Sequence, residues 1–237
     1  MRIADMNWQQ VESYLLHDDR CVLPVGSVEQ HAQLSLCVDA ILSERVAVEA
    51  AEPLHVPVYP CMPYGLAPYF SAFPGSMSLR VETLLAVFRD LIASVRRSGF
   101  RRVLIVNGHG GNAPVANLAK ELMANMPEMS IKYHPWWSGT RVTEASRKID
   151  PIGSHASWIE NFPWTRLANS PAPDGEKTLV DYAQLDMSSP EETRTLIGDG
   201  NFGGAYQKAD SEMLEIWKVG VAETRAILEG PWPDHGE

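Results

Sequence analysis

The chain contains little cysteine and no long hydrophobic run. Only three of its 237 residues are cysteine, and none of them forms a CxxC pair. This pattern argues against a disulfide framework and favours buried thiols in a reducing compartment. No stretch approaches the roughly 18 consecutive apolar residues of a membrane span, and the first residues, MRIAD, contain no apolar signal region. We therefore expect a cytoplasmic protein that does not contact a membrane.

Basic residues are also scarce. The chain has 20 Lys and Arg against 30 Asp and Glu, a formal net charge of -10. A nucleic-acid-binding protein usually has a basic surface, so we expect no nucleic-acid partner. The P-loop, the GxSxG nucleophile elbow, the HExxH helix and the zinc-finger spacings are all missing from the sequence. These absences exclude the commonest phosphate-binding, serine-hydrolase and zinc-protease patterns.

Short apolar runs alternate with helical patterns up to about residue 135. With 45% hydrophobic residues, a chain of this length predicts one globular domain spanning residues 1–237. Strand–helix alternation predicts an α/β fold, with a mostly parallel sheet and helices on both of its faces. The expected strands are 22–25, 56–59, 103–106 and 131–134, and the expected helices are 39–52, 81–98, 114–126 and 209–228.

Two of the predicted strands end in polar motifs. The run 102–106 is followed by Asn-Gly-His-Gly-Gly-Asn, which contains His109. The run 22–25 is followed by Gly-Ser-Val-Glu-Gln-His, which contains Glu29 and His31, and Asp39 comes eight residues later. Ligands of open α/β sheets bind at the carboxyl ends of the strands. We therefore expect these side chains to lie at one edge of the sheet.

Two carboxylates and two imidazoles favour Zn²⁺, Mn²⁺ or Fe²⁺ over Mg²⁺. Glu29 and His31 are two residues apart, so both point to one face if the backbone there is extended. Asp39 would begin a helix, where a carboxylate is favoured and can bridge two metals. Taken singly, Asp39 could be a helix N-cap and His109 a turn residue. Their combination at two strand ends predicts a metal site.

A third segment, 155–161, carries His155 and Glu160. From the first turn of a helix, both side chains could reach one cavity. Glu160 could complete a second metal site, and His155 could move a proton or stabilise an oxyanion. By itself the segment is a weak signal, and a helical turn at the surface is its more common explanation.

These motifs together resemble the creatininase (creatinine amidohydrolase) family of metal-dependent amidohydrolases. The resemblance extends over about residues 20–165 and implies a compact α/β fold with a binuclear metal site. It also implies a homo-oligomer, a hexamer built as a trimer of dimers. The residues on which the resemblance rests are the segments 24–31, 73–76, 107–112 and 155–161, together with Asp39.

The resemblance also implies a role for each metal ligand. Glu29, Asp39 and His109 would hold one ion, and Asp39 would be shared with the other. In creatininases proper, the last ligand of the second ion is a Glu at the position of Gly111 here. Glu160 is its substitute, so the second ion would be held by His31, Asp39 and Glu160.

The resemblance assigns His155 and Glu160 to catalysis and Trp136 and Trp137 to substrate stacking. Gln33 stands near a position where the family often has a histidine, and we expect it to contact substrate. The spacing from His31 to Asp39 is one residue shorter than the family's usual spacing, and Asn161 replaces the common Thr. The metal site therefore carries over to this chain, whereas creatinine as the substrate does not.

We predict a metal-dependent hydrolase that cleaves a non-peptide C–N bond of a small cyclic or linear amide through a metal-activated water. Two related activities remain open: deformylation of a formamido-pyrimidine intermediate and trimming of a modified peptide. A different class also remains open, a non-catalytic small-molecule-binding protein that has kept the metal residues.

Overall fold

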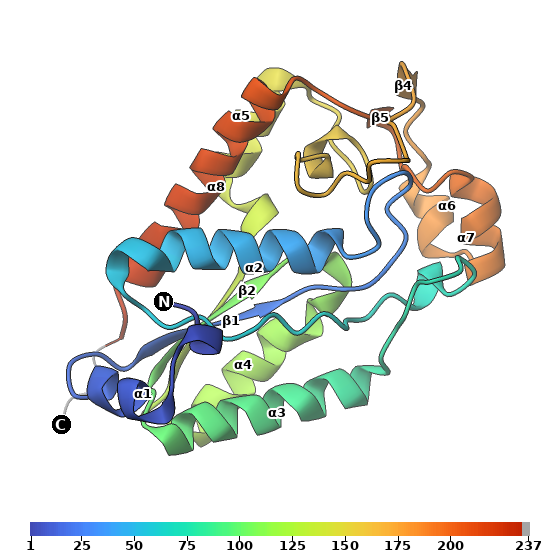
Figure 1. Cartoon of the computed structure of the whole chain (residues 1–237). Coiled ribbons are helices and arrows are strands. Elements are labelled where there is room, and N and C mark those ends of the chain that lie inside the picture. Colours follow the sequence, from blue (N-terminus) through green and yellow to red (C-terminus); the bar gives the residue numbers. More distant parts are fainter. Residues whose placement is uncertain (234–237) are drawn as a thin grey trace.

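The computed structural model describes residues 1–233 and has a parallel sheet at its centre (Figure 1). The strands lie in the order β1-β2-β3, and Val25 lies opposite Asn107 in their register. Asn107 in turn lies opposite Pro135, so the three strands end level with one another. The strands are β1 (Arg20–Val25), β2 (Arg102–Asn107) and β3 (Ser130–Pro135).

Helices cover both faces of this sheet, which confirms the predicted fold class. In Figure 1, α2 crosses one face, with α8 beside it, and α3 and α4 cover the other face. An antiparallel pair, β4 (Glu176–Lys177) and β5 (Gly204–Ala205), lies apart from the sheet. The helices are α1 (Trp8–Leu15), α2 (Val38–Ala51), α3 (Val81–Ser98), α4 (Pro114–Asn125), α5 (Thr140–Ile149), α6 (Tyr182–Asp186), α7 (Pro190–Ile197) and α8 (Asp210–Glu229). Within residues 1–233, no helix is both long and apolar enough to cross a bilayer.

Strand β2 has apolar side chains on both of its faces. Leu104 and Val106 pack into one core with residues of α2 and α8. Val103 and Ile105 pack into a second core with residues of α3 and α4. A strand covered on both faces needs an unbroken apolar run rather than an alternating one. That requirement explains the run that precedes His109.

The predicted strand 56–59 does not form. Within the segment, Val58 forms single parallel bridges with Val22 of β1 and with Arg2, and Met62, beyond the segment, forms another with Val25. Pro57 and Pro60 explain the difference, because a proline has no N–H to donate to a strand ladder.

The segment that contains α6 and α7 packs beyond the carboxyl ends of the strands. Phe70, Ile197 and Phe202 form a third, smaller apolar cluster there. This cluster buries much of the aromatic loop 64–73, although Tyr64 remains 44% exposed. The chain itself therefore covers part of the apolar surface that the loop would otherwise expose.

Acid should destabilise the fold through His134 on β3. This side chain is buried, and its Nε2 lies 3.1 Å from the Thr224 hydroxyl of α8. Burial lowers the pKa of His134 to about 4, against a smaller opposing effect of Glu223. The unfolded chain, with an ordinary histidine pKa, then binds more protons than the folded chain between about pH 6.5 and pH 4. Stability should fall by about 2 to 3 kcal/mol over that window as pH decreases.

Urea unfolding at pH 7.5 and pH 4.5 measures this loss, with His134→Gln as the comparison. The variant keeps a group that can hydrogen-bond to Thr224 but cannot titrate. It should lose clearly less stability than the wild type over the same interval. An identical loss in both proteins would show that His134 is not responsible.

Candidate metal centre

Glycines allow the start of α2 to lie against the ends of β1 and β2. A Cβ at Gly26 would be 2.4 Å from the backbone nitrogen of Ala40, and one at Gly108 would be 2.2 Å from the carbonyl oxygen of Asp39. No other residue type tolerates such a close approach. Asp39, in the first turn of α2, is therefore held between the loops that carry the strand-end motifs.

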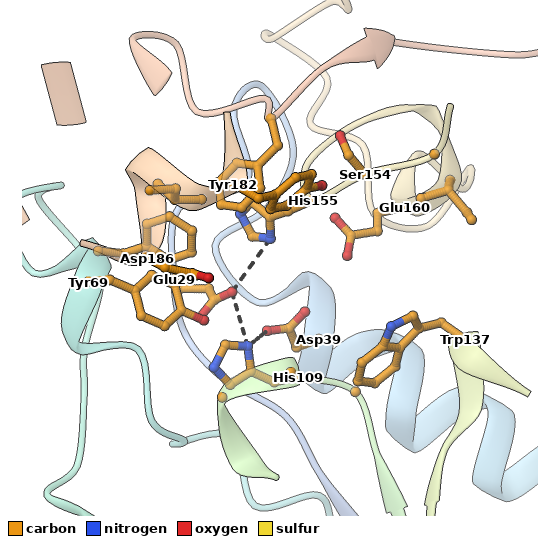
Figure 2. A pocket seen from close by; sticks show the side chains of 18 of the residues that line it. Glu29, Asp39, Tyr69, His109, Trp137, Ser154, His155, Glu160, Tyr182 and Asp186 are labelled. Atoms are coloured by element: carbon orange, nitrogen blue, oxygen red, sulfur yellow. Dashed lines mark ion pairs between the residues drawn. The ribbon is translucent and has the colours of Figure 1, made fainter. Parts of the chain in front are cut away.

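The four side chains predicted from the strand ends do converge. Asp39 Oδ1 lies 3.1 Å from His31 Nε2, and Asp39 Oδ2 lies 3.3 Å from His109 Nδ1. Glu29 Oε1 lies 3.1 Å from the same His109 nitrogen, as Figure 2 shows. All four residues are buried. The carboxylate of Asp39 thus has one oxygen facing His31 and the other facing His109.

Glu160 joins this cluster from the 3₁₀ turn Trp158–Glu160. Its Oε2 lies 3.7 Å from His31 Nε2 and accepts a hydrogen bond of 2.6 Å from the backbone N–H of Ala156. Three groups of possible ligand atoms lie within 4.8 Å of one another: Glu29, His31 and His155; Glu29, Asp39 and His109; and His31, Asp39 and Glu160. The last two match the predicted ligand sets, and we call them the first and second ligand groups. Asp39 belongs to both, which is the geometry of a bridging ligand.

The family resemblance places a glutamate ligand at position 111 in some relatives, but the glycine found here cannot supply a carboxylate. A Cβ there would lie 2.0 Å from the carbonyl oxygen of Leu66 and 2.5 Å from His109 Nε2. Any side chain at Gly111 would require the segment around Leu66 to move. Glu160 is the carboxylate that completes the second group of ligand atoms.

Outer hydrogen bonds orient both histidines for metal binding. His31 Nδ1 lies 3.1 Å from the carbonyl oxygen of Glu29, and His109 Nε2 lies 2.7 Å from that of Leu66. Protons on these nitrogens leave the other nitrogen of each ring facing the carboxylates with its lone pair. Within the described residues, neither buried oxygen of Glu29 accepts a hydrogen bond. Buried oxygens of this kind, beside imidazole lone pairs, fit divalent cations.

Without metal, the cluster holds extra protons. Burial opposes a charge on His31, but the carboxylates of Asp39 and Glu160 outweigh it and raise the pKa of His31 to about 10. Burial likewise opposes a charge on His109, whose pKa Glu29 and Asp39 raise well above its usual range. Burial raises the pKa of Glu160 to about 7, with His31 opposing it. Both imidazoles are therefore charged at neutral pH.

Metal binding should release these protons, because a metal ligates neutral imidazole. We expect at least about two protons per chain on filling both sites at pH 7.5, from His31 and His109, with a further contribution from Glu29 and Glu160, whose pKa values burial also raises. Calorimetric titration with Zn²⁺ in buffers of different ionisation enthalpy counts them. His134→Gln is the control, since it removes a buried histidine outside the cluster and should leave the count unchanged. Zinc binding without proton release would contradict the proton distribution described above.

His155 lies beside the cluster but is held differently. Its Nε2 lies 2.9 Å from the backbone oxygen of Gln30, and its Nδ1 lies 3.8 Å from Glu29 Oε1. Its ring lies between Phe70 and Phe202, with centroid distances of 4.7 and 4.8 Å. Burial, together with the charge of His31, keeps the pKa of His155 well below its usual range. The side-chain amide nitrogen of Gln30 lies 2.9 Å from the same Nε2, so Gln30 contacts this nitrogen twice and Nδ1 is the ring nitrogen that faces Glu29 in the cluster.

The cluster opens into a cavity of about 600 Å³. Trp137 lines it, as expected, on the side opposite Tyr69 and Asp186 (Figure 2). Trp136 does not line it, contrary to expectation, because its indole packs against Phe162 and Trp217 in the core. Adjacent residues in a 3₁₀ turn point in different directions, so only one of the two tryptophans can face the cavity.

Gln33 also does not line the cavity, contrary to expectation. Both polar atoms of its amide are buried and have no hydrogen-bond partner within the described part of the chain. Sequence reasoning, in turn, missed four residues of the cavity wall as functional candidates: Tyr69, Tyr182, Asp186 and Phe202. Three of them belong to a region without clear periodicity, and only the aromatic composition of the loop around Tyr69 gave a signal.

Comparisons with known proteins identify relatives of this chain. The creatininase family model, described as creatinine amidohydrolase, matches residues 4–226. The chain is 33% identical to a creatinine amidohydrolase of Pseudomonas putida over 119 residues, which cover 47% of this chain and 45% of that protein. It is 30% identical to a 3-dehydro-scyllo-inosose hydrolase of Thermotoga maritima over 107 residues, 44% of this chain and 34% of that protein. The matched stretch thus spans less than half the length of each curated relative.

Solved structures extend the likeness of the fold to nearly the whole chain. A crystal structure of creatininase shares 23% identity and a TM-score of 0.78, covering 96% of each chain. A creatininase variant described as a Zn-Zn type shares 21% identity and a TM-score of 0.79, covering 96% of this chain and 97% of that one. Because the family model matches from residue 4 to residue 226, the chain belongs to the creatininase family.

Proposed function

We propose that this protein is a metal-dependent amidohydrolase that cleaves a non-peptide C–N bond of a small cyclic or linear amide. The observation that carries the proposal is the pair of ligand groups that share Asp39 at the bottom of a cavity of about 600 Å³. A cavity of that size is ordinary for a small-molecule site. Membership of the creatininase family supports the same activity.

In this proposal two divalent ions are bound at the cluster. Glu29 and His109 would hold one, His31 and Glu160 the other, and Asp39 would bridge them. A mixture of carboxylate and imidazole ligands suits Zn²⁺, Mn²⁺ and Fe²⁺. Related structures described as a manganese creatininase and as a Zn-Zn type support manganese and zinc as the first choices.

Bound ions of this kind would lower the pKa of a water molecule and polarise the amide carbonyl. His155 would take part in proton transfer, because its Nδ1 faces the cluster and its Nε2 is held by Gln30. Its low pKa makes it a ready donor to the leaving nitrogen once it has accepted a proton. The rings of Phe70 and Phe202 hold it in place and exclude water around it.

The names of the relatives leave the substrate open. One acts on creatinine and another is an inosose hydrolase, so family membership alone does not select a substrate. We infer that creatinine is a poor substrate, on the basis of the shortened segment between His31 and Asp39. Formamides remain candidates as the reacting amide.

The proposal is tested by loading the protein with Zn²⁺, Mn²⁺ or Fe²⁺ and assaying cyclic amides, linear amides, formamides and ureas. We expect metal-dependent release of an amine or ring opening for at least one class, with creatinine among the weakest. Chelation of the metal should abolish this activity, and returning the metal should restore the activity. Two metals bound with no turnover of any class would refute the proposed activity and favour a binding protein.

Trp137 should contribute to substrate affinity rather than to metal binding. It lines the cavity but belongs to neither ligand group. Trp137→Ala should raise KM for the best amide about tenfold through lost aromatic contact, with the metal content unchanged. Trp136→Phe is the matched control, because it alters the adjacent core residue and should lower Tm without changing KM. A Trp137→Ala variant with the wild-type KM would place the substrate elsewhere.

We also infer a homo-oligomer in the cytoplasm, with the hexamer of the family resemblance as the expected state. Exposed apolar side chains on and beside α1 support an interface, since Trp8 is 70% and Leu16 77% exposed in the single chain. Light scattering tests this part separately, and a monomer at micromolar concentration would refute it without affecting the proposed chemistry.

A further inference from the structure

The wall of the cavity that faces the metal centre is aromatic. Tyr69 and Phe70 meet with ring centroids 4.5 Å apart, and Phe70 and Phe202 meet at 5.9 Å. Tyr182, on α6, continues the series with its ring 6.1 Å from that of Phe202. These four residues, which we call the aromatic wall, all line the cavity. The rings of Tyr69 and Tyr182 offer π-faces on which an organic cation binds well, while the buried Phe70 and Phe202 pack against His155 behind them.

Asp186 adds a negative charge to this wall. It is the last residue of α6, it lines the same cavity, and Figure 2 places it on the side of Tyr69 and Tyr182. Within residues 1–233, its carboxylate makes no ion pair or side-chain hydrogen bond, and it belongs to no group of metal ligands. An acid at a helix C-terminus gains nothing from the helix dipole. Asp186 is exposed, so its carboxylate is accessible to a ligand that enters the cavity.

Within the described residues, no lysine or arginine lines the cavity. The nearby cations of the same region are already engaged: Lys177 is paired with Asp199, and Arg194 lies over the ring of Phe73. The three carboxylates of the metal centre would be offset by the ions that they bind. Asp186 then remains as a negative charge that nothing in the cavity wall neutralises.

We propose that Asp186 and the aromatic wall form a recognition site for an organic cation, an ammonium or guanidinium group on the part of the substrate that does not react. The reacting amide would lie at the metal centre while the cation lies between Asp186 and the rings of Tyr69 and Tyr182. This inference deepens the proposed amidohydrolase function and rests on it. It selects amides that carry a positive charge over neutral or anionic amides of the same size.

The test compares three probes of equal chain length on the zinc-loaded protein by calorimetric titration. N-acetylputrescine carries an ammonium group, N-butylacetamide is neutral, and N-acetyl-γ-aminobutyrate carries a carboxylate. We expect N-acetylputrescine to bind about tenfold more tightly than N-butylacetamide, in line with one cation–π contact and one partly exposed ion pair. The anionic probe should bind most weakly.

Asp186→Asn should reduce the preference for the cationic probe to about twofold, while zinc content and affinity for the neutral probe stay unchanged. Asp174→Asn removes an equal charge from the same region, outside the cavity, and should keep the full preference. Tyr182→Leu should weaken the binding of the cationic probe more than the binding of the neutral probe. Equal binding of all three probes to the wild type, or an unchanged preference in Asp186→Asn, would overturn the assignment.

The outcomes separate this inference from the proposed activity. Tight binding of the cation without hydrolysis of any amide would preserve the recognition site and refute the amidohydrolase. Hydrolysis of neutral and cationic amides at equal kcat/KM would preserve the amidohydrolase and refute the recognition site.

Discussion

Asp39→Asn should leave a folded protein that binds neither metal and has lost at least about 10³-fold of its activity. Asp39 is the only residue common to the two ligand groups, with one oxygen facing each histidine. The substitution keeps the shape of the side chain but removes the charge that both ions would share. The loss of one carboxylate should therefore empty two sites rather than one.

Elemental analysis after dialysis, together with circular dichroism, measures both parts of this expectation. Asp90→Asn, an exposed position on α3, is the control and should keep the wild-type metal content and activity. An Asp39→Asn variant that still binds one equivalent of metal tightly would show that the two sites are independent. The bridging assignment would then be wrong.

Glu160→Gln should reduce the metal content to about one ion per chain and activity by at least about 100-fold. Glu160 belongs only to the second ligand group, with His31 and Asp39. The amide oxygen of glutamine can still accept the hydrogen bond from Ala156, so the local turn should survive. Glutamine carries no negative charge and is a much weaker ligand than a carboxylate.

Metal analysis of Glu160→Gln checks this result, with Glu144→Gln on the exposed face of α5 as the control. The comparison of metal content between the two variants is the informative measurement. Asp39→Asn should lose both ions, whereas Glu160→Gln should lose only the one held with His31. Full metal content in Glu160→Gln would mean that another group completes the second site.

The sequence was sufficient to predict that the candidate ligands lie close together, because three of them lie at strand ends. An apolar run that stops at a glycine-rich turn defines where a strand ends, and parallel strands end at one edge of a sheet. Glu29, His31 and His109 could be placed together on that basis. The start of α2 at Asp39 followed from the helical pattern that begins there.

The same reasoning was less successful where conformation depends on tertiary packing. Trp136 and Trp137 are adjacent in the sequence, and only the packing of Trp136 against Trp217 decides which of them faces the cavity. The segment 56–59 has the composition of a strand, but its prolines leave it as single bridges to β1.

Asp186 could not have been identified from the sequence at all. It lies on a five-residue helix in an irregular region and reaches the cavity only because α6 packs beyond the strand ends. No motif and no periodic pattern marks such a position. Residues that determine specificity on loops of this kind depend on how the whole chain folds.

The most direct test of the binuclear centre is a crystal structure of the zinc-loaded protein with anomalous diffraction data collected above the zinc edge. The account predicts two anomalous peaks per chain, about 3.5–4 Å apart, with one Asp39 oxygen on each. One peak should lie beside Glu29 and His109, and the other beside His31 and Glu160. A single peak at full zinc occupancy, or two peaks that do not share Asp39, would contradict it.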